Sequence, residues 1–205
     1  MQYLVLAGMW FSWCFFHSAL ISRPVTNYLR AHCGPAFRWH RLAYNGLAIL
    51  TLLPVLTYAQ AIKSEPFFAW HGSWRLVQVL LICAAVGLFT AGARHYDARQ
   101  FLGLRQLRGE DFCPVLSESC TLDRTGILSA IRHPWYVGGM LIIWARDLDL
   151  CVLISNLIIT GYFIVGAVLE ERKLSLEFGD VYKDYQRRTS MFFPYRWLKS
   201  RLKFS

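Results

Sequence analysis

The sequence predicts an all-α integral membrane protein with five transmembrane helices, the last two of which form a hairpin. Only 17% of its 205 residues are charged and 55% are hydrophobic, whereas soluble domains carry roughly 25% charged residues. Four uncharged apolar runs reach the roughly 18 to 20 residues that cross a bilayer as a helix. The chain shows no alternation of strands and helices, which excludes a soluble Rossmann-type domain.

The basic balance of the chain invites comparison with nucleic-acid-binding proteins, because the formal net charge is +9. The basic residues lie in the connections between apolar runs and in the C-terminal tail, where membrane orientation and anionic lipid headgroups account for them. We therefore expect the lipid bilayer as a partner, and no nucleic acid. The six cysteines show no CxxC pair and no metal-type spacing with histidine, so we expect no metal site. Cys113 and Cys120 fall on the side expected to be cytosolic, where thiols stay reduced, so we expect no disulfide.

The first apolar run, residues 3–21, contains a single ionisable side chain, that of His17. An ionisable side chain within a membrane span usually faces protein or a water-filled cavity, which makes His17 a candidate binding residue. The alternative is a histidine at the membrane interface that bonds to the backbone or to Ser18. The run lacks a basic flank and a following cleavage site, so we expect it to stay attached rather than to act as a signal peptide.

The second and third runs, residues 42–62 and 76–93, contain no charged side chain. Arg23-Pro24 is expected to end the first helix. The connection from there to the second run carries four arginines and no acidic residue, so we expect it to be cytoplasmic. Tyr44 and Asn45 place polar groups near the cytosolic end of the second run. An aromatic belt in residues 63–75 indicates a short connection on the other side of the membrane.

The fourth run, residues 135–145, has eleven residues, which make only about 16 Å of helix, too little to cross the membrane alone. Either the helix begins upstream near Thr125, or the preceding motif lies in a protein-lined cavity. Both alternatives bury Arg132 and His133 at membrane depth, where unsatisfied polar groups are costly. We therefore expect partners or a ligand at this point.

The fifth run, residues 150–169, ends at the acidic pair Glu170 and Glu171. If the fourth and fifth runs form a hairpin, the acidic pair meets the polar end of the fourth run. Beyond the pair, apolar and aromatic residues recur at helical spacing, which predicts an amphipathic C-terminal helix after a break at Gly179.

These elements make a single membrane domain over residues 1–205. Its parts are three transmembrane helices in residues 1–93, a cytosolic connector in 94–133, a helical hairpin with a cofactor-binding motif in 134–194 and a basic tail in 195–205. The distribution of arginine and lysine puts the N-terminus outside and the C-terminus in the cytoplasm. A pocket beside the basic connections would open to the cytosol.

Short motifs follow one another in residues 125–194. They are Gly126, Arg132-His133-Pro134-Trp135-Tyr136-Val137-Gly138, Glu170-Glu171-Arg172-Lys173-Leu174, Phe178-Gly179-Asp180-Val181-Tyr182-Lys183-Asp184-Tyr185 and Pro194. In this order they resemble the C-terminal half of the integral-membrane methyltransferases typified by isoprenylcysteine carboxyl methyltransferase. The resemblance covers about a third of the chain, and the combination of motifs is specific.

The N-terminal half resembles a bacterial branch, the methanethiol S-methyltransferase-like and denitrification-associated membrane proteins. The matching segments are His17-Ser18 and Arg41-Leu42-Ala43-Tyr44-Asn45. This branch implies the bacterial inner membrane as the location. Its matching residues His17, Arg41, Tyr44 and Asn45 are the candidates for binding the methyl acceptor.

The resemblance implies S-adenosylmethionine as cofactor. The residues that match the family's pocket are Leu122, Leu128, Arg132, His133, Pro134, Trp135, Tyr136, Gly138 and one of Glu170 or Glu171. The residue types suit that ligand, because the faces of tryptophan and tyrosine attract a sulfonium by roughly 0.5–2 kcal/mol. A glutamate can pair with an ammonium group or accept from ribose hydroxyls, and Gly138 permits a close approach of the backbone.

These residues lead to the hypothesis of an S-adenosylmethionine-dependent methyltransferase that acts on a small or lipophilic thiol. His133 is the candidate catalytic residue, although a role in cofactor binding is the stronger expectation. The isoprenylcysteine enzymes carry an arginine about one turn before the acidic pair, where this chain has Gly166-Ala167-Val168, so a prenylcysteine carboxylate is disfavoured. Two alternatives stay open: an NADPH-dependent membrane reductase like the sterol reductases, which share a His-Pro-x-Tyr motif, and a non-catalytic membrane protein linked to nitrogen-oxide metabolism.

Overall fold

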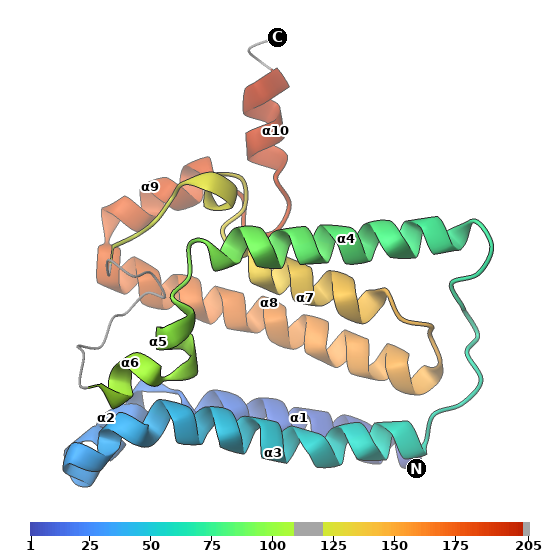
Figure 1. Cartoon of the computed structure of the whole chain (residues 1–205), viewed down its shortest axis with the longest axis horizontal. Helices are drawn as coiled ribbons and strands as arrows, with labels where there is room; N and C mark the ends of the chain where they lie inside the picture. Colours follow the sequence, from blue (N-terminus) through green and yellow to red (C-terminus); the bar gives the residue numbers. More distant parts are fainter. Residues whose placement is uncertain (109–120, 203–205) are drawn as a thin grey trace. The chain divides into compact units, whose positions relative to one another are not determined.

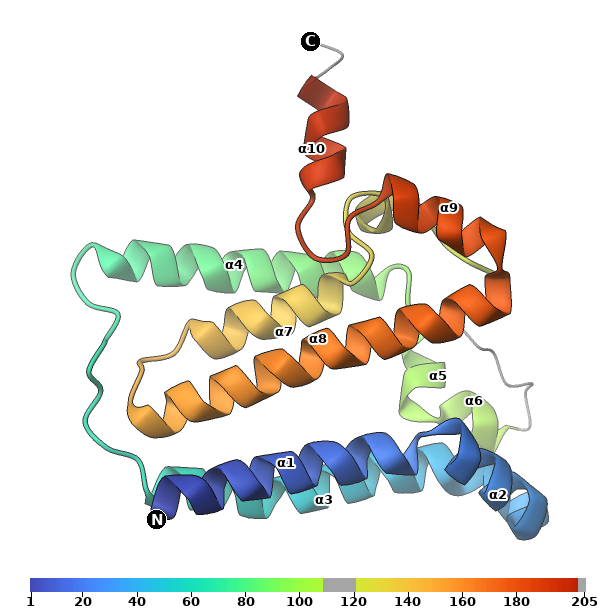
Figure 2. The ribbon, with the colours of Figure 1, turned by 180° about the vertical axis from the view of Figure 1, so that it is seen from behind.

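A computed structural model describes residues 1–108 and 121–202 of the chain. Within these residues every regular element is a helix, and the two β-bridges are isolated (Figures 1 and 2). In chain order the elements are α1 (Gln2–Leu20), α2 (Arg23–Cys33), the 3-10 helix η1 (Gly34–Trp39), α3 (His40–Ala61), α4 (Trp74–Ala93), α5 (Ala98–Leu102), α6 (Leu104–Leu107), the 3-10 helix η2 (Gly126–Ser129), α7 (Pro134–Trp144), α8 (Leu150–Phe178), α9 (Asp180–Arg188) and α10 (Tyr195–Leu202). The all-α prediction is confirmed for this part of the chain. Cys113 and Cys120 lie outside the described residues.

Four helical segments are long and apolar enough to cross a membrane. They are Gln2–Leu20, Arg23–Ala61, Trp74–Ala93 and Leu150–Phe178, and each covers one of the long predicted runs to within one residue. The fourth predicted run is α7, which has 11 residues and begins at Pro134 rather than upstream near Thr125. The structure thus settles the start of this helix, while a fifth crossing stays a prediction.

The connection before α3 differs from its predicted form, because it is helical. Pro24 lies in the first turn of α2, where its missing N–H has no intrahelical partner to lose and its fixed φ suits a helix. Gly34, with a φ of +48°, then ends α2. The proline that indicated the end of one helix therefore also begins the next.

The chain divides into two compact units, and the first comprises Met1–Ala69, Ala98–Phe112 and Asp147–Tyr162. In it α1 and α3 lie side by side. Its buried core consists of Leu6, Trp10, Val55 and Cys151. The indole N–H of Trp10 donates to Ser155 Oγ at 2.9 Å, so the polar group buried by this packing has a partner.

The start of α8 in this unit is fixed by Asp149, a carboxylate that is only 1% exposed. One carboxylate oxygen accepts from the backbone N–H of Val152 at 2.7 Å, and the other accepts from Ser64 N–H at 3.2 Å. Asp149 thereby caps the helix and fastens the segment that follows α3. An antiparallel bridge between Phe68 and Leu148 lies beside it.

The second unit comprises Trp70–Asp97, Cys113–Arg146 and Phe163–Ser205. In it α4 and α7 lie side by side. Glycine makes this close packing possible, because a Cβ on Gly92 of α4 would lie 2.5 Å from Trp135 Nε1. A Cβ on Gly138 of α7 would lie 3.0 Å from Phe89. The helix that carries the aromatic motif is thus locked onto α4 through two glycines.

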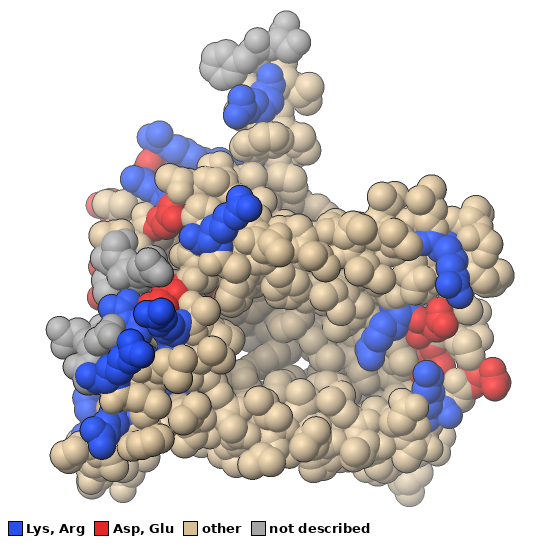
Figure 3. All heavy atoms as spheres, viewed as in Figure 1, with Lys and Arg blue, Asp and Glu red and all other residues tan. Residues whose placement is uncertain are grey.

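Charged side chains lie beside the ends of the long helices in each unit, and uncharged side chains cover the lengths between (Figure 3). In α8 the residues from 150 to 169 include no Asp, Glu, Lys or Arg, and the charges begin at Glu170. The helix continues to Phe178, so its last turns are long enough to extend beyond a bilayer core of roughly 30 Å.

Candidate functional site

The start of α7 is held by backbone hydrogen bonds to a segment far away in the sequence. The N–H of Arg132 donates to Ser190 O at 3.0 Å, and the N–H of His133 donates to Met191 O at 3.2 Å. His133 is the N-cap of α7, and Pro134 occupies the first turn, where its fixed φ favours helix initiation. The polar motif is therefore a constrained strand-like segment that leads directly into a helix.

Glu171, in the C-terminal part of α8, faces this segment, and both of its carboxylate oxygens accept hydrogen bonds. Its Oε1 accepts from Arg132 Nε at 2.7 Å and from His133 Nε2 at 3.1 Å. Arg132 Nη2 lies 2.6 Å from the same oxygen, and Gln186 Nε2 donates to Oε2 at 2.8 Å. The Glu171 side chain is only 12% exposed. One guanidinium bound through two nitrogens, a histidine and an amide leave this carboxylate little capacity for a ligand.

Arg132 is bonded through all three of its guanidinium nitrogens and is 8% exposed. Besides Glu171, it donates through Nη1 to the carbonyl oxygens of Gln186 and Thr189. One guanidinium therefore joins the start of α7, the C-terminal part of α8 and the end of α9. An ion pair buried in this way is strongly destabilised when either partner is removed, because the remaining charge loses its compensation.

Glu170 has a different environment, although it is the neighbour of Glu171 in sequence. Its side chain is 39% exposed. Its Oε2 accepts one hydrogen bond, from the Tyr136 hydroxyl at 3.1 Å, and lies 3.9 Å from His133 Nδ1. A carboxylate offers about four acceptor positions, so Glu170 retains capacity for a ligand. The acidic pair is thus divided into a buried glutamate that holds the fold and an accessible glutamate beside a tyrosine.

Tyr136 and Trp135 flank this accessible carboxylate from α7. The Tyr136 ring packs edge-on against Phe163 with centroids 5.6 Å apart. Trp135 donates its indole N–H to Phe89 O at 3.2 Å and contacts the Tyr96 ring edge-on at 4.6 Å. Burial raises the pKa of Tyr96, and the nearby Glu170 carboxylate raises it further. Tyr96 therefore stays a neutral hydroxyl in this part of the molecule.

A histidine and an aspartate that sequence reasoning missed lie in the same unit. His95 Nδ1 and Asp123 Oδ2 are 2.6 Å apart. Asp123 Oδ1 also accepts from the backbone N–H and the hydroxyl of Thr125, at 2.9 and 2.7 Å. Burial alone would raise the pKa of Asp123, but the hydrogen bonds from His95 and Thr125 outweigh it and lower the pKa to about 2. No spacing rule connects residues 28 positions apart, so the sequence offered no signal for this pair.

The His95–Asp123 pair explains the glycine that begins the family motif. Gly126 has a φ of +52°, and a Cβ at this position would lie 2.5 Å from His95 Nε2. Both the backbone conformation and the imidazole therefore require glycine. Leu128, two residues on, is buried, and its carbonyl accepts from the Tyr185 hydroxyl at 2.6 Å. Leu122 is half-buried in the segment before the pair.

The glycines of α7 allow it to pack closely against its neighbours. The missing side chain of Gly138 makes room for Phe89, and that of Gly139 makes room for Phe163, 2.9 Å from where a Cβ would stand. A close approach of the Gly138 backbone to a ligand stays a prediction. The close approach that the structure shows is therefore between helices, because α7 must fit against α4 and α8.

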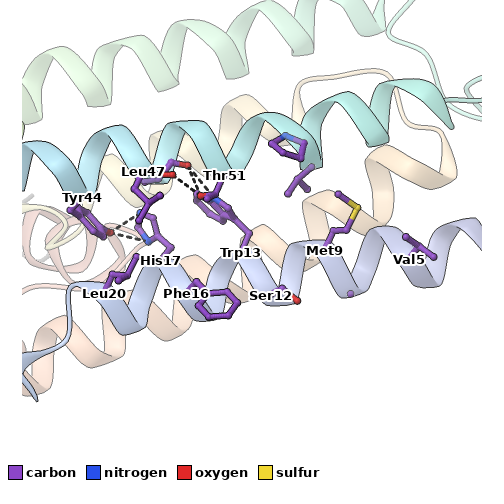
Figure 4. A pocket seen from close by; sticks show the side chains of 14 residues that line it. Val5, Met9, Ser12, Trp13, Phe16, His17, Leu20, Tyr44, Leu47 and Thr51 are labelled. Carbon is purple, nitrogen blue, oxygen red and sulfur yellow. Dashed lines mark hydrogen bonds between the residues drawn. The ribbon is translucent and has the colours of Figure 1, made fainter. Parts of the chain in front are cut away.

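The candidates for binding the acceptor lie in the first unit, where two of them form a polar cluster. His17 Nδ1 lies 2.7 Å from the Tyr162 hydroxyl. His17 Nε2 lies 2.8 Å from the Tyr44 hydroxyl, as Figure 4 shows. Ser18 Oγ lies 2.9 Å from the Tyr162 hydroxyl. The interface alternative anticipated a bond with Ser18, but here Tyr162 stands between the two side chains. Tyr162 was absent from the candidates because one tyrosine within an apolar run carries no distinguishing pattern.

Arg41 and Asn45, the other two candidates, contact the end of α5. Arg41 Nε donates to Phe101 O at 3.2 Å. Asn45 Nδ2 donates to Phe101 O at 3.2 Å and to Leu102 O at 3.3 Å. The last carbonyls of a helix lack intrahelical partners, so these two side chains satisfy α5. Arg41 also lies 5.7 Å from the centre of the Tyr44 ring.

Comparison with known proteins gives a family match over most of the chain. The family described as NnrU protein matches residues 5–192. No solved structure matches the chain.

Shorter stretches resemble curated enzymes named methanethiol S-methyltransferase. The protein of Pseudomonas sp. (strain GM41(2012)) is 39% identical over 67 residues, which are 32% of this chain and 26% of that protein. A Bradyrhizobium diazoefficiens protein, methanethiol S-methyltransferase 1, is 40% identical over 67 residues, 32% of this chain and 24% of that protein. The Mycobacterium tuberculosis protein is 32% identical over 101 residues, 47% of this chain and 39% of that protein. The matched stretches thus span well under half the length of these relatives.

Proposed function

This chain belongs to the NnrU protein family, and on that premise we propose that it is an integral-membrane methyltransferase that uses S-adenosylmethionine to methylate a thiol. Its similarity to enzymes named methanethiol S-methyltransferase supports the reaction class. The four helices that are long and apolar enough to cross a membrane support the location. A fifth crossing through α7, an outside N-terminus and a cytosolic cofactor site complete the proposal, in keeping with the arginine-rich connections.

The observation that carries the proposal is the accessible carboxylate of Glu170 beside Tyr136 and His133. A carboxylate with free acceptor positions suits the ribose hydroxyls or the ammonium group of S-adenosylmethionine. Tyr136 orients that carboxylate through its hydroxyl. His133 bonds to Glu171, so it is a positioning residue for the site rather than a free base. The residues present therefore fit the cofactor that the family resemblance implies.

When bound, the cofactor supplies a methyl group activated by its sulfonium. The chain would then bind and align the reactants and exclude water, since alignment in a dry site provides large effective molarities. Trp135 and Tyr136 offer aromatic surface beside the site, where a cation is favoured over a neutral ligand. The occupied state of Glu171 and Arg132 keeps this part of the site rigid.

Methyl transfer is tested with the purified protein in lipid nanodiscs, labelled S-adenosylmethionine and a panel of thiols, with the matching alcohols as controls. We expect labelled thioethers and no labelled ethers. The variant Glu170→Gln should lower the rate, whereas Asp180→Asn, at a carboxylate whose side chain is 94% exposed, should leave it unchanged.

The alternatives give different outcomes in a parallel measurement of thermal unfolding. Stabilisation by NADPH but not by S-adenosylhomocysteine would replace the proposal with a reductase. Stabilisation by S-adenosylhomocysteine without transfer to any thiol would point to a non-catalytic membrane protein that has kept the cofactor site.

A further inference from the structure

An apolar groove of about 690 Å³ lies between α1 and α3 in the first unit. None of its 14 lining residues, all within the described part of the chain, is Asp, Glu, Lys or Arg. Small-molecule sites typically have roughly 300–1,000 Å³, apolar walls and a few placed polar groups. The groove therefore has the size and lining of a site for a neutral ligand.

The polar groups of the groove gather at Tyr44 and His17 (Figure 4). Tyr44 is 7% exposed, and its hydroxyl reaches His17 from α3. Trp13 and Thr51 also line the groove, but each already donates to a backbone carbonyl, that of Ala48 at 3.1 Å and that of Leu47 at 2.7 Å. Ser12 also belongs to the lining, but Figure 4 shows its hydroxyl turned away from α3. The end at Tyr44 is thus where a ligand's polar atom finds a partner.

The polar side chains at this end carry one more polar hydrogen than their mutual contacts use. His17, Tyr44, Tyr162 and Ser18 carry one polar hydrogen each when the imidazole is neutral. Three pairs of side chains are in contact: His17 with Tyr162, His17 with Tyr44 and Tyr162 with Ser18. The Tyr44 hydroxyl also lies 3.1 Å from His17 Nδ1, but the single lone pair of that nitrogen faces the Tyr162 hydroxyl at the shorter distance of 2.7 Å. Within this cluster of described residues, four hydrogens therefore meet three pairs of side chains.

The tautomer of His17 decides which hydrogen is left over. With the proton on Nε2, His17 donates to Tyr44, Tyr162 donates to Nδ1 and Ser18 donates to Tyr162, which leaves the Tyr44 hydrogen free. With the proton on Nδ1, the direction reverses and the Ser18 hydrogen is left. Tyr44 lines the groove, so the first arrangement presents a hydrogen-bond donor to a ligand there.

We propose that this groove binds the hydrocarbon body of an uncharged thiol and that the Tyr44 hydroxyl donates to its sulfur. The inference rests on the proposed methyl transfer to a thiol and narrows its substrate class. A one-carbon thiol would fill a small fraction of the volume, so the groove selects thiols with a longer apolar body. The absence of charged lining residues in the described groove disfavours acidic or basic thiols, because their charge would be desolvated without a partner.

Two pairs of variants test separately the binding of the ligand's hydrocarbon body and the hydrogen bond to its sulfur. A Cβ on Gly8, which lines the groove, has nothing within 4 Å, and the same holds for Gly46, which lies in α3 outside the lining. Gly8→Leu therefore adds a side chain to the groove from a Cβ that meets no other atom, and Gly46→Leu is its matched control. Tyr44→Phe removes the donor, and Tyr58→Phe removes another α3 hydroxyl, one that bonds to Gln2 O, as the second control.

Binding is measured by headspace gas chromatography over protein-containing nanodiscs, after subtraction of protein-free nanodiscs, with hexanethiol and heptane as probes. The wild type should bind hexanethiol about fivefold more tightly than heptane, since one hydrogen bond contributes about 1 kcal/mol. Tyr44→Phe should abolish this preference and keep heptane binding, while Gly8→Leu should lose both probes. Gly46→Leu and Tyr58→Phe should bind like the wild type.

Equal binding of the two probes by the wild type, a preference that survives Tyr44→Phe, or unchanged binding by Gly8→Leu would each overturn the inference. Its failure is distinguishable from that of methyl transfer. Stabilisation by S-adenosylhomocysteine reports the cofactor site independently and should not change in Gly8→Leu. If the wild type binds hexanethiol in the groove but transfers no methyl group, the result would support the groove as a binding site and contradict the proposed reaction.

Discussion

Glu170 and Glu171 are adjacent in α8, yet their carboxylates have opposite environments. That of Glu171 lies 2.6 Å from the Arg132 guanidinium and is 12% exposed, whereas that of Glu170 is 39% exposed and accepts one hydrogen bond from Tyr136. Successive residues of a helix point about 100° apart, which is enough to put one carboxylate among structural partners and the other beside them. The two positions should therefore respond differently to the same substitution.

Glu170→Gln should weaken the binding of S-adenosylhomocysteine by about tenfold or more, because a hydrogen bond to a charged group contributes roughly 1.5–3 kcal/mol. The melting temperature of the free protein should change little, since the side chain is partly exposed. Isothermal titration and thermal unfolding in detergent check the two statements. His133→Ala should also weaken binding, through the loss of its bond to Glu171. Normal binding by both variants would show that the cofactor site lies elsewhere.

Arg132→Met should destabilise the protein by about 3 kcal/mol or more, because it leaves a buried carboxylate without its main partner. Unfolding by denaturant in mixed micelles measures the change. The double variant Arg132→Met with Glu171→Leu should recover part of the stability, since no charge then stays buried. A double variant no more stable than Arg132→Met would contradict an ion pair as the origin of the effect.

Gly126→Ala should be more destabilising than Gly179→Ala, although the two glycines have similar φ values of +52° and +55°. A φ near +55° is a strained backbone conformation for an alanine and costs of order 1–3 kcal/mol at either site. Only at Gly126 does the new Cβ also meet an imidazole, at 2.5 Å, while at Gly179 nothing lies within 4 Å. Thermal unfolding compares the two variants. Adding His95→Ala should remove the additional destabilisation of Gly126→Ala. Equal melting temperatures for the two glycine variants would rule out the clash.

Acid should remove the contribution of Asp123 to stability. Its pKa in the folded protein is about 2, below the ordinary value of 3.8. The folded state therefore favours the ionised form, and the stabilisation is complete above about pH 4 and is lost as the pH falls toward 2. The difference in unfolding free energy between the wild type and Asp123→Asn should shrink over this interval. A difference that stays constant from pH 5 to pH 2 would mean that the carboxylate is not stabilised as an anion.

The long helices were predictable because a membrane span leaves a plain signal, a run of uncharged apolar residues whose length matches the bilayer. The shortness of α7 was predictable for the same reason, because its apolar run is too short to cross a bilayer. The contact of Arg132 and His133 with the acidic pair was predictable because the fourth and fifth runs were expected to form a hairpin. The division of labour between Glu170 and Glu171 was not, because periodicity alone does not tell which of two adjacent polar residues faces the protein. α2 was missed because Pro24 was interpreted only as a helix terminator.

The His95–Asp123 pair and the contact of Tyr162 with His17 lay beyond sequence reasoning for another reason. Each joins residues far apart in the chain, and their encounter depends on how helices pack. Gly126 could be named from the family motif but not explained. Its explanation required the position of an imidazole that belongs to the segment after α4.

The hydrogen bonds that hold the start of α7 determine when the candidate cofactor site can form during synthesis of the chain. Arg132 and His133 depend on the backbone of Ser190 and Met191, and Glu171 depends on Gln186. While the ribosome is still adding residues beyond α8, the aromatic motif has been synthesised but lacks these anchors. The candidate cofactor site is therefore one of the last features of the chain to become complete, and a chain cut short before Gln186 should insert its long helices yet never assemble it.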